Sequence, residues 1–159
     1  MISGVVYEIN MDECFYAWED GPALLNGKNI SVAQTRKLDD SLIATGFPYT
    51  NFAKLEQYLK LLEDLMKSSR GIRRLGSAAA DLAYVACGRF DAFYEYGLNP
   101  WDVAGGSFIV QRAGGIVSDF KGNNDYIHGG NIIASNPLVY NELMEKVAHY
   151  FQLEIGEEN

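Results

Sequence analysis

The chain has 159 residues, 48% of them hydrophobic and 21% charged, which is the balance of a soluble globular protein with room for one sizeable core. Its formal net charge of −8 argues against functions that need a basic surface, because such a protein repels nucleic acid and anionic membranes, and neither is expected as a partner. With no long apolar run, no signal-peptide start and only Cys14 and Cys87 as cysteines, the chain is predicted to be a cytoplasmic protein with reduced thiols.

The first 40 residues predict an antiparallel meander without helices. Apolar and β-branched residues form short runs, and Asn26-Gly27 between two such runs is a strong hairpin signal. The expected strands cover residues 4–9, 14–18 and 28–32. The composition changes near residue 40, so we divide the chain into a meander over residues 1–40 and a C-terminal α/β domain over residues 41–159.

From Ser41 onward, helical and strand patterns alternate, which predicts an α/β layer with a mixed or largely parallel sheet. Apolar residues recur at helical spacing over residues 51–69, which predicts the longest helix. Ser77 is a suitable N-cap for an alanine-rich helix, and Gly88 is a suitable residue to end it.

Two Asn-Pro pairs predict the starts of two further helices, because Asn suits the N-cap and Pro suits the first helical position. The helix after Asn99-Pro100 is expected to end at Gly114-Gly115, and the helix after Asn136-Pro137 is expected to run to about Phe151. The remaining expected strands cover residues 41–45, 90–96, 116–120 and 131–135. For residues 156–159 we expect disorder.

Asp102 is the first candidate for chemistry. It lies at the start of the helix that begins at Pro100, where an acidic residue also stabilises the free N–H groups and the helix dipole. It follows a strand and the Gly97 turn, and that edge of an α/β sheet is a common place for a ligand site. An acidic protein that handles phosphate needs a positive group in its site, and Mg²⁺ binds one or two such carboxylates. Both a helix-stabilising and a metal-ligating role fit Asp102.

Glu95 is the second candidate. Alternation along the strand of residues 90–96 places Asp91, Phe93 and Glu95 on one face of the sheet. Glu95 is either a solvated carboxylate at the strand end or a ligand-binding group. The chain between Glu95 and Asp102 contains a turn, so the two carboxylates can meet in one cleft.

Gly76, Ser77 and Ala78 form the third candidate group. Small residues at a helix start let a sugar hydroxyl or a phosphate approach the backbone N–H groups, although such a start is more often a plain packing feature. Arg73 and Arg74 precede it and either face an anion or pair with acids at the surface. His128 and His149 have no partner at metal-binding spacing, and we expect both at the surface.

Five segments in order resemble the inositol monophosphatase family. They are residues 73–79 (RRLGSAA), 88–97 (GRFDAFYEYG), 99–105 (NPWDVAG), 113–119 (AGGIVSD) and 131–136 (NIIASN). The likeness covers nearly the whole chain, and its most specific part is Trp101-Asp102 with the flanking glutamate and glycines. The resemblance implies a layered αβαβα sandwich and Mg²⁺-dependent hydrolysis of a phosphate monoester, either an inositol phosphate or a related sugar phosphate.

The same resemblance implies roles for individual residues. Asp102 is similar to the metal-ligating aspartate of the family, and Glu95 to the glutamate that holds inositol hydroxyls. Gly76, Ser77 and Ala78 are similar to the segment that lines the substrate pocket. The implied mechanism is attack by water on a phosphate that the cations polarise, with the leaving oxygen stabilised by the same charge.

The chain departs from the family pattern in one respect. The family's Asp-Pro-Ile/Leu-Asp-Gly-Thr block and its upstream glutamate pair do not occur in the 159 residues, which leaves Asp102 as the single metal-binding carboxylate. One carboxylate holds Mg²⁺ weakly, because the ion gives up its waters reluctantly. In the family those elements precede the strand that here begins at Gly4, so we expect the chain to begin just after them and to be inactive alone.

Two alternatives to an enzyme portion stay open. The chain is then either a non-catalytic module that binds a ligand or a partner, or one chain of a split phosphatase. In every case the strands at residues 4–9 and 14–18 present an open edge. We therefore expect self-association through residues 1–20, or association with a missing N-terminal half.

Overall fold

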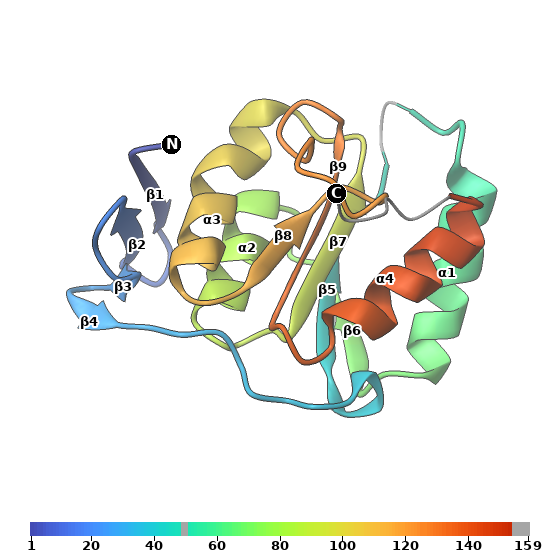
Figure 1. The fold of residues 1–159 in the computed structure, drawn as a ribbon, viewed down its shortest axis with the longest axis horizontal. Coiled ribbons are helices and arrows are strands. Elements are labelled where there is room, and N and C mark those ends of the chain that lie inside the picture. The colour runs from blue at the N-terminus through green and yellow to red at the C-terminus, as the bar shows by residue number, and fades with distance from the viewer. Residues whose placement is uncertain (49–50, 154–159) are drawn as a thin grey trace.

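The computed structural model describes residues 1–48 and 51–153, whose helices and strands stack in four layers (Figure 1). An antiparallel sheet is followed by helices α2 (Ala78–Ala86) and α3 (Pro100–Arg112), then by a mixed sheet, and then by helices α1 (Leu55–Lys67) and α4 (Tyr140–Phe151). The predicted α/β class is confirmed, and the layers follow the order of an αβαβα sandwich. Within the described ranges, no helix is both long and apolar enough to cross a membrane.

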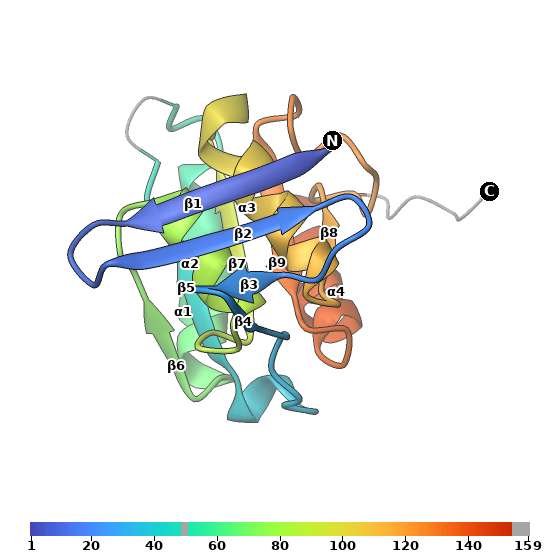
Figure 2. The ribbon, with the colours of Figure 1, turned by 90° about the vertical axis from the view of Figure 1, so that its left-hand side faces the viewer.

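The first sheet is an antiparallel meander, as the sequence predicted, and Figure 2 shows it lying across α2 and α3. The prediction that residues 1–40 contain no helix is wrong, because a short 3-10 helix, η1, covers Leu38–Asp40. The strands of the sheet are β1 (Ser3–Glu8), β2 (Glu13–Trp18), β3 (Leu24–Leu25) and β4 (Lys28–Asn29). Asn26 and Gly27 have φ angles of 47° and 80°, the left-handed values that the tight hairpin requires. The strand expected at residues 28–32 ends early, because the Val32 N–H bonds the Ala113 carbonyl at the end of α3 (3.2 Å).

The second sheet is mixed, with the strand order β6-β5-β7-β9-β8. Its strands are β5 (Leu42–Thr45), β6 (Gly71–Arg73), β7 (Ala92–Tyr96), β8 (Ile116–Ser118) and β9 (Asn131–Ser135). Strand β5 pairs in parallel with β6 and β7, whereas β9 pairs antiparallel with β7 and β8. The sequence did not predict β6, because three residues are too few to show an alternating pattern.

Two helices begin later than the sequence predicted. Helix α1 begins at Leu55 rather than at residue 51. Helix α4 begins at Tyr140, so the start predicted at Asn136-Pro137 is wrong. There the Asn136 side chain accepts the N–H groups of Leu138 (2.9 Å) and Val139 (3.3 Å), which forms a turn ahead of the helix. The disorder expected for residues 156–159 concerns residues outside the described ranges.

The central sheet separates two apolar clusters. Phe93 of β7 packs into the cluster that contains α2 and α3, and it shares that cluster with Phe15 of the first sheet. Tyr94 and Tyr96 point the other way, into the cluster with α1 and α4. Strand alternation along β7 is therefore as predicted. The division of the chain into two domains at residue 40 stays a prediction.

Glycines bring α3 against two other elements. A Cβ atom on Gly4 of β1 would lie 2.6 Å from the carbonyl oxygen of Gly105, and a Cβ atom on Gly106 would lie 2.7 Å from the Cβ of Leu82 in α2. Both distances are shorter than real Cβ atoms tolerate. Side chains at these positions would push the first sheet or α2 away from α3.

We predict that Gly106→Ala destabilises the fold. Alanine is better than glycine in a helix by about 1 kcal/mol, but overpacking against Leu82 costs about 1–3 kcal/mol. The free energy of unfolding, measured by urea titration with circular dichroism, should therefore fall. Gln111→Ala, at an exposed position of the same helix, should leave it nearly unchanged. A Gly106→Ala chain as stable as the wild type would show that α2 and α3 can separate without cost.

Candidate functional site

A cavity of about 250 Å³ lies beside the C-terminal end of β7. The ends of β5 and β7 and the starts of α2 and α3 contribute its walls, and the parallel arrangement of β5 and β7 places their carboxyl ends at this same edge. All five residues singled out from the sequence line it, namely Gly76, Ser77, Ala78, Glu95 and Asp102. The fold thus brings together segments that are well separated along the chain. We call this the site cavity.

Glu95 is buried at one wall of the site cavity, with 7% of its surface exposed. The alternative of a solvated strand-end carboxylate is therefore wrong. A side chain at Gly46 would overlap the Glu95 carboxylate, so the backbone after β5 closes over it. Burial, with smaller contributions from the carboxylates of Asp81 and Asp102, raises the pKa of Glu95 to about 7 against the opposing effect of the Arg74 guanidinium.

Asp102 caps its own helix while it lines the cavity. Its Oδ2 accepts the backbone N–H of Asn99 at 2.9 Å, and the Asn99 side-chain amide lies 3.4 Å from the same oxygen. The helix-stabilising role is thus present, and it occupies Oδ2. In the part of the chain that the structure describes, Oδ1 has no hydrogen-bond partner. One carboxylate oxygen therefore orients the side chain while the other faces no competing donor.

The start of α2 forms another wall of the site cavity. Gly76 has a φ of 88°, and Ser77 is the N-cap whose hydroxyl oxygen accepts the Ala80 N–H at 3.4 Å. The first N–H groups of a helix have no partner within the helix, and with the helix dipole they attract an anion or a hydroxyl oxygen. Ala78 keeps this approach clear of large side chains.

The two arginines before α2 have different surroundings. Arg74 lines the site cavity, and its guanidinium lies 5.4 Å from the centroid of the Phe47 ring, a cation–π distance. Arg73 is exposed, and it donates to the Ile72 carbonyl at 3.0 Å instead. Of the two, Arg74 supplies positive charge to the site.

Asp81 is a buried acidic residue near the site that the sequence did not reveal as a candidate. It lies in the first turn of α2 and is completely buried, and neither of its carboxylate oxygens has a hydrogen-bond partner among the described residues. Burial raises its pKa to about 7, and Arg74 opposes the shift. An aspartate in a first helical turn is ordinarily a solvated dipole-stabilising residue, so its sequence position gave no signal of burial.

The side chains at the site cavity are of the kind that binds a hard cation, but too few of them are arranged to hold one. Asp102 and Glu95 offer the carboxylate oxygens that Mg²⁺ prefers. Within residues 1–48 and 51–153, however, no group of three or more His, Cys, Asp or Glu side chains is arranged to hold a metal ion. His128 and His149 are exposed, as expected, so neither adds a ligand to the site cavity.

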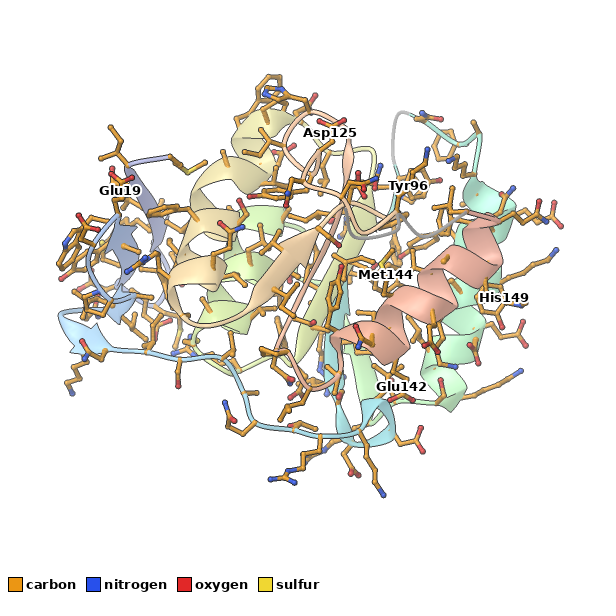
Figure 3. The ribbon with its side chains drawn as sticks, viewed as in Figure 1. Glu19, Tyr96, Asp125, Glu142, Met144 and His149 are labelled. Atoms are coloured by element: carbon orange, nitrogen blue, oxygen red, sulfur yellow. The ribbon has the colours of Figure 1, made fainter. Side chains whose placement is uncertain are left out.

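A larger cavity, of about 410 Å³, lies between the start of α1, the end of α4 and the β8–β9 connection. Tyr96 and Asp125, both labelled in Figure 3, belong to its lining. Lys54, Lys121 and Asp119 line it too, so charges of both signs surround it and favour no single class of ligand. None of the residues singled out as site residues from the sequence lies there.

Known proteins resemble this chain in sequence and in fold. A sequence model of the inositol monophosphatase family matches residues 1–155. The Escherichia coli (strain K12) protein named Nus factor SuhB is 44% identical over 140 residues, 88% of this chain and 52% of that protein. The structure of the extragenic suppressor protein suhB from Bartonella henselae is 41% identical with a TM-score of 0.87, covering 92% of this chain and 56% of that one. The inositol monophosphatase from Anabaena (Nostoc) sp. PCC 7120 is 35% identical with a TM-score of 0.84, covering 97% and 60%.

The chain spans about half the length of the curated relatives that it matches. The matched structures are likewise covered over little more than half of their length. The similarity of fold nevertheless includes nearly all of this chain, so the layers and the edge of the sheet that carries the site cavity correspond to those of the relatives.

We predict that stability falls as the pH rises from about 4 to 7. The pKa values of Asp81 and Glu95 rise from 3.8 and 4.5 to about 7, so the folded chain binds protons more tightly than the unfolded chain in this window. The stabilisation is fully present below the unfolded pKa values and is lost through the folded ones. Asp81→Asn should remove part of the decline, roughly 2–4 kcal/mol, in urea titrations at pH 5 and pH 8.

Asp20→Asn is the matched control, because Asp20 is exposed. It removes the same charge from the surface and should leave the pH dependence of unfolding unchanged. If Asp81→Asn and Asp20→Asn have the same effect, the burial of Asp81 does not influence stability.

Proposed function

Because the chain belongs to the inositol monophosphatase family, we propose that it carries part of a site for Mg²⁺-dependent hydrolysis of a phosphate monoester, an inositol phosphate or a related sugar phosphate. The observation that supports this most is the convergence of Glu95, Asp102 and the start of α2 on one cavity. The family resemblance implied ligand-binding roles for these residues, and in the structure they all line one cavity. A solved relative bears the name inositol monophosphatase.

The residues of the site cavity fit the parts of such a substrate. Glu95 binds hydroxyl groups of the polyol, since a buried carboxyl group with a pKa near 7 accepts or donates hydrogen bonds at neutral pH. The N–H groups at Ser77 and Ala78 and the Arg74 guanidinium bind negatively charged or electron-rich oxygens. The Gly46 backbone covers one side of the Glu95 carboxylate.

Asp102 is the residue that would hold Mg²⁺, because it is oriented by its own helix cap and retains one oxygen without a partner in the described ranges. When bound, Mg²⁺ supplies the charge that polarises the phosphate and stabilises the leaving oxygen. Asp102 is the only family metal ligand in the 159 residues, so the ion is held weakly. We therefore propose that the chain alone has no appreciable activity.

We predict binding of inositol 1-phosphate without hydrolysis. In NMR titrations with Mg²⁺ present, the amide signals of residues 76–78 and of Glu95 should shift. Glu95→Gln should weaken binding about tenfold, which corresponds to about 1.4 kcal/mol. The reason is that an amide replaces the carboxyl group that hydrogen-bonds the inositol hydroxyls. Asp20→Asn serves as the control.

Two outcomes would contradict this picture. Release of phosphate by the purified chain with Mg²⁺, abolished by Asp102→Asn, would show that one carboxylate suffices for turnover. Signals that shift only at residues remote from the site cavity would place binding elsewhere.

A second candidate function is a non-catalytic interaction module or one chain of a split phosphatase. Two observations favour it. The curated relatives bear the name Nus factor, which is not the name of a phosphatase. Strand β1 is also an edge strand within the described part of the chain, with only β2 as its neighbour. Its side chains Val5 and Tyr7 are 63% and 54% exposed, and Ile9, just after the strand, is 78% exposed. An edge of this kind is a template for pairing with another chain.

We also propose that the protein is cytoplasmic. Cys14 and Cys87 are free, partly buried thiols, which is the usual state of cysteines in a reducing compartment.

We predict self-association through residues 1–20. The mass measured by static light scattering should exceed that of a monomer and rise with protein concentration. Val5→Lys places a charge on the open edge and should reduce the mass to that of the monomer. Leu138→Lys, at a residue 50% exposed on another surface, should leave the association intact. A wild-type chain that stays monomeric at high concentration would disprove this prediction.

A further inference from the structure

Helix α1 lies on the opposite side of the central sheet from α2 and α3 (Figure 1). One of its side chains nevertheless contacts the backbone of the site. Tyr58 is 1% exposed, and its hydroxyl donates to the Gly46 carbonyl oxygen at 2.8 Å. Thr45 Oγ1 lies 3.0 Å from the same hydroxyl and 2.8 Å from the Tyr94 carbonyl oxygen. These buried hydroxyl groups tie the end of β5 to α1 and to β7.

The segment held by Tyr58 is a wall of the site cavity. Gly46 packs directly against the Glu95 carboxylate, and it leaves no room for a side chain. Phe47 lines the same cavity, and its ring lies at a cation–π distance from the Arg74 guanidinium. The Tyr58 ring also meets the Phe47 ring edge-on, with centroids 6.3 Å apart. Tyr58 therefore contacts both residues that surround the charged groups.

We propose that Tyr58 is a positioning residue for substrate recognition, which fixes the wall formed by Gly46 and Phe47 and thereby the placement of Glu95 and Arg74. The significance of Glu95 rests on the proposed function, but the positioning itself does not. The hydroxyl groups of Tyr58 and Thr45 are the polar link that the described structure provides between the α1 layer and this wall.

The Tyr58 hydroxyl is suited to a hydrogen bond that persists over a wide pH range. Burial raises its pKa to about 12, so the phenol keeps its proton throughout the physiological range and always donates to the carbonyl. Thr45 Oγ1 also lies 3.4 Å from the Gly46 carbonyl oxygen, but this contact is long, and the same hydroxyl donates at 2.8 Å to the Tyr94 carbonyl. Loss of the Tyr58 hydroxyl leaves the buried Gly46 carbonyl without its short hydrogen bond, and the backbone that confines Glu95 is then free to move.

The test compares Tyr58→Phe with Tyr96→Phe. Each removes one buried hydroxyl from a tyrosine of the same apolar cluster, and their rings contact one another with centroids 5.8 Å apart. The Tyr96 hydroxyl, however, has no hydrogen-bond partner among the described residues. In the free protein, Tyr58→Phe should shift the NMR signals of the Gly46 and Phe47 amides and of the Glu95 carboxyl carbon. Tyr96→Phe should leave these signals in place.

Binding gives the second readout. Tyr58→Phe should weaken affinity for inositol 1-phosphate about tenfold, because hydroxyl recognition depends on Glu95. Its affinity for inorganic phosphate should fall by a smaller factor, about twofold or less, because the N–H groups at the start of α2 bind phosphate together with Arg74 and do not rest on this wall. A merely destabilised protein would lose both affinities by the same factor. If Tyr58→Phe does not fold, Thr45→Val and Thr45→Ser make the same comparison, and only the serine variant, which keeps a hydroxyl, should retain the wild-type signals.

The proposal is overturned if Tyr58→Phe leaves the Gly46, Phe47 and Glu95 signals unchanged, or if both affinities fall equally. A wild-type chain that binds neither ligand contradicts the proposed function instead. In that case the signals of the free protein still decide whether Tyr58 positions the wall.

Discussion

Helix α3 packs closely against two other elements at consecutive glycines, and the site cavity depends on this contact. Gly105 faces β1, where a Cβ atom on Gly4 would lie 2.6 Å from the Gly105 carbonyl oxygen, and Gly106 faces the Leu82 side chain of α2 at a distance that leaves no room for a Cβ atom. Because α3 is fixed against α2 in this way, its first turn lies beside the first turn of α2. That arrangement puts Asp102 and the Ser77 N-cap on the walls of one cavity. A wider separation would leave the same residues on independent surfaces.

The sequence predicted those features that depend on local chemistry. Asn99-Pro100 determines the start of α3, and strand alternation determines the direction in which Glu95 points, so both residues of the carboxylate pair could be identified without the structure. The five site residues share a cavity because the ends of parallel strands meet at one edge. The αβαβα order followed from the resemblance, and the alternation of helices and strands indicated only the α/β class.

Features that depend on tertiary packing could not be predicted in this way. Strand β6 is three residues long and exists because β5 offers it a parallel neighbour. Asn136 signals a helix start, but its side chain bonds a turn that precedes the helix. Asp81 is buried only because α2 packs against its neighbours, and the link from Tyr58 to Gly46 crosses between layers. Each of these depends on contacts between segments that a local pattern does not contain.

The buried carboxyl groups near the site cavity reduce the stability of the folded chain at neutral pH. The carboxylates of Asp81 and Asp102 add to the raised pKa of Glu95, while Arg74 is the positive group that opposes the shifts of Asp81 and Glu95. Ionising the two buried carboxyl groups at neutral pH therefore works against folding. The entry of positive charge into the cavity would relieve that repulsion, and so would a proton. Positive charge beside Glu95 would therefore act in the same direction as protonation, because it would offset part of the cost of ionising this buried carboxyl group.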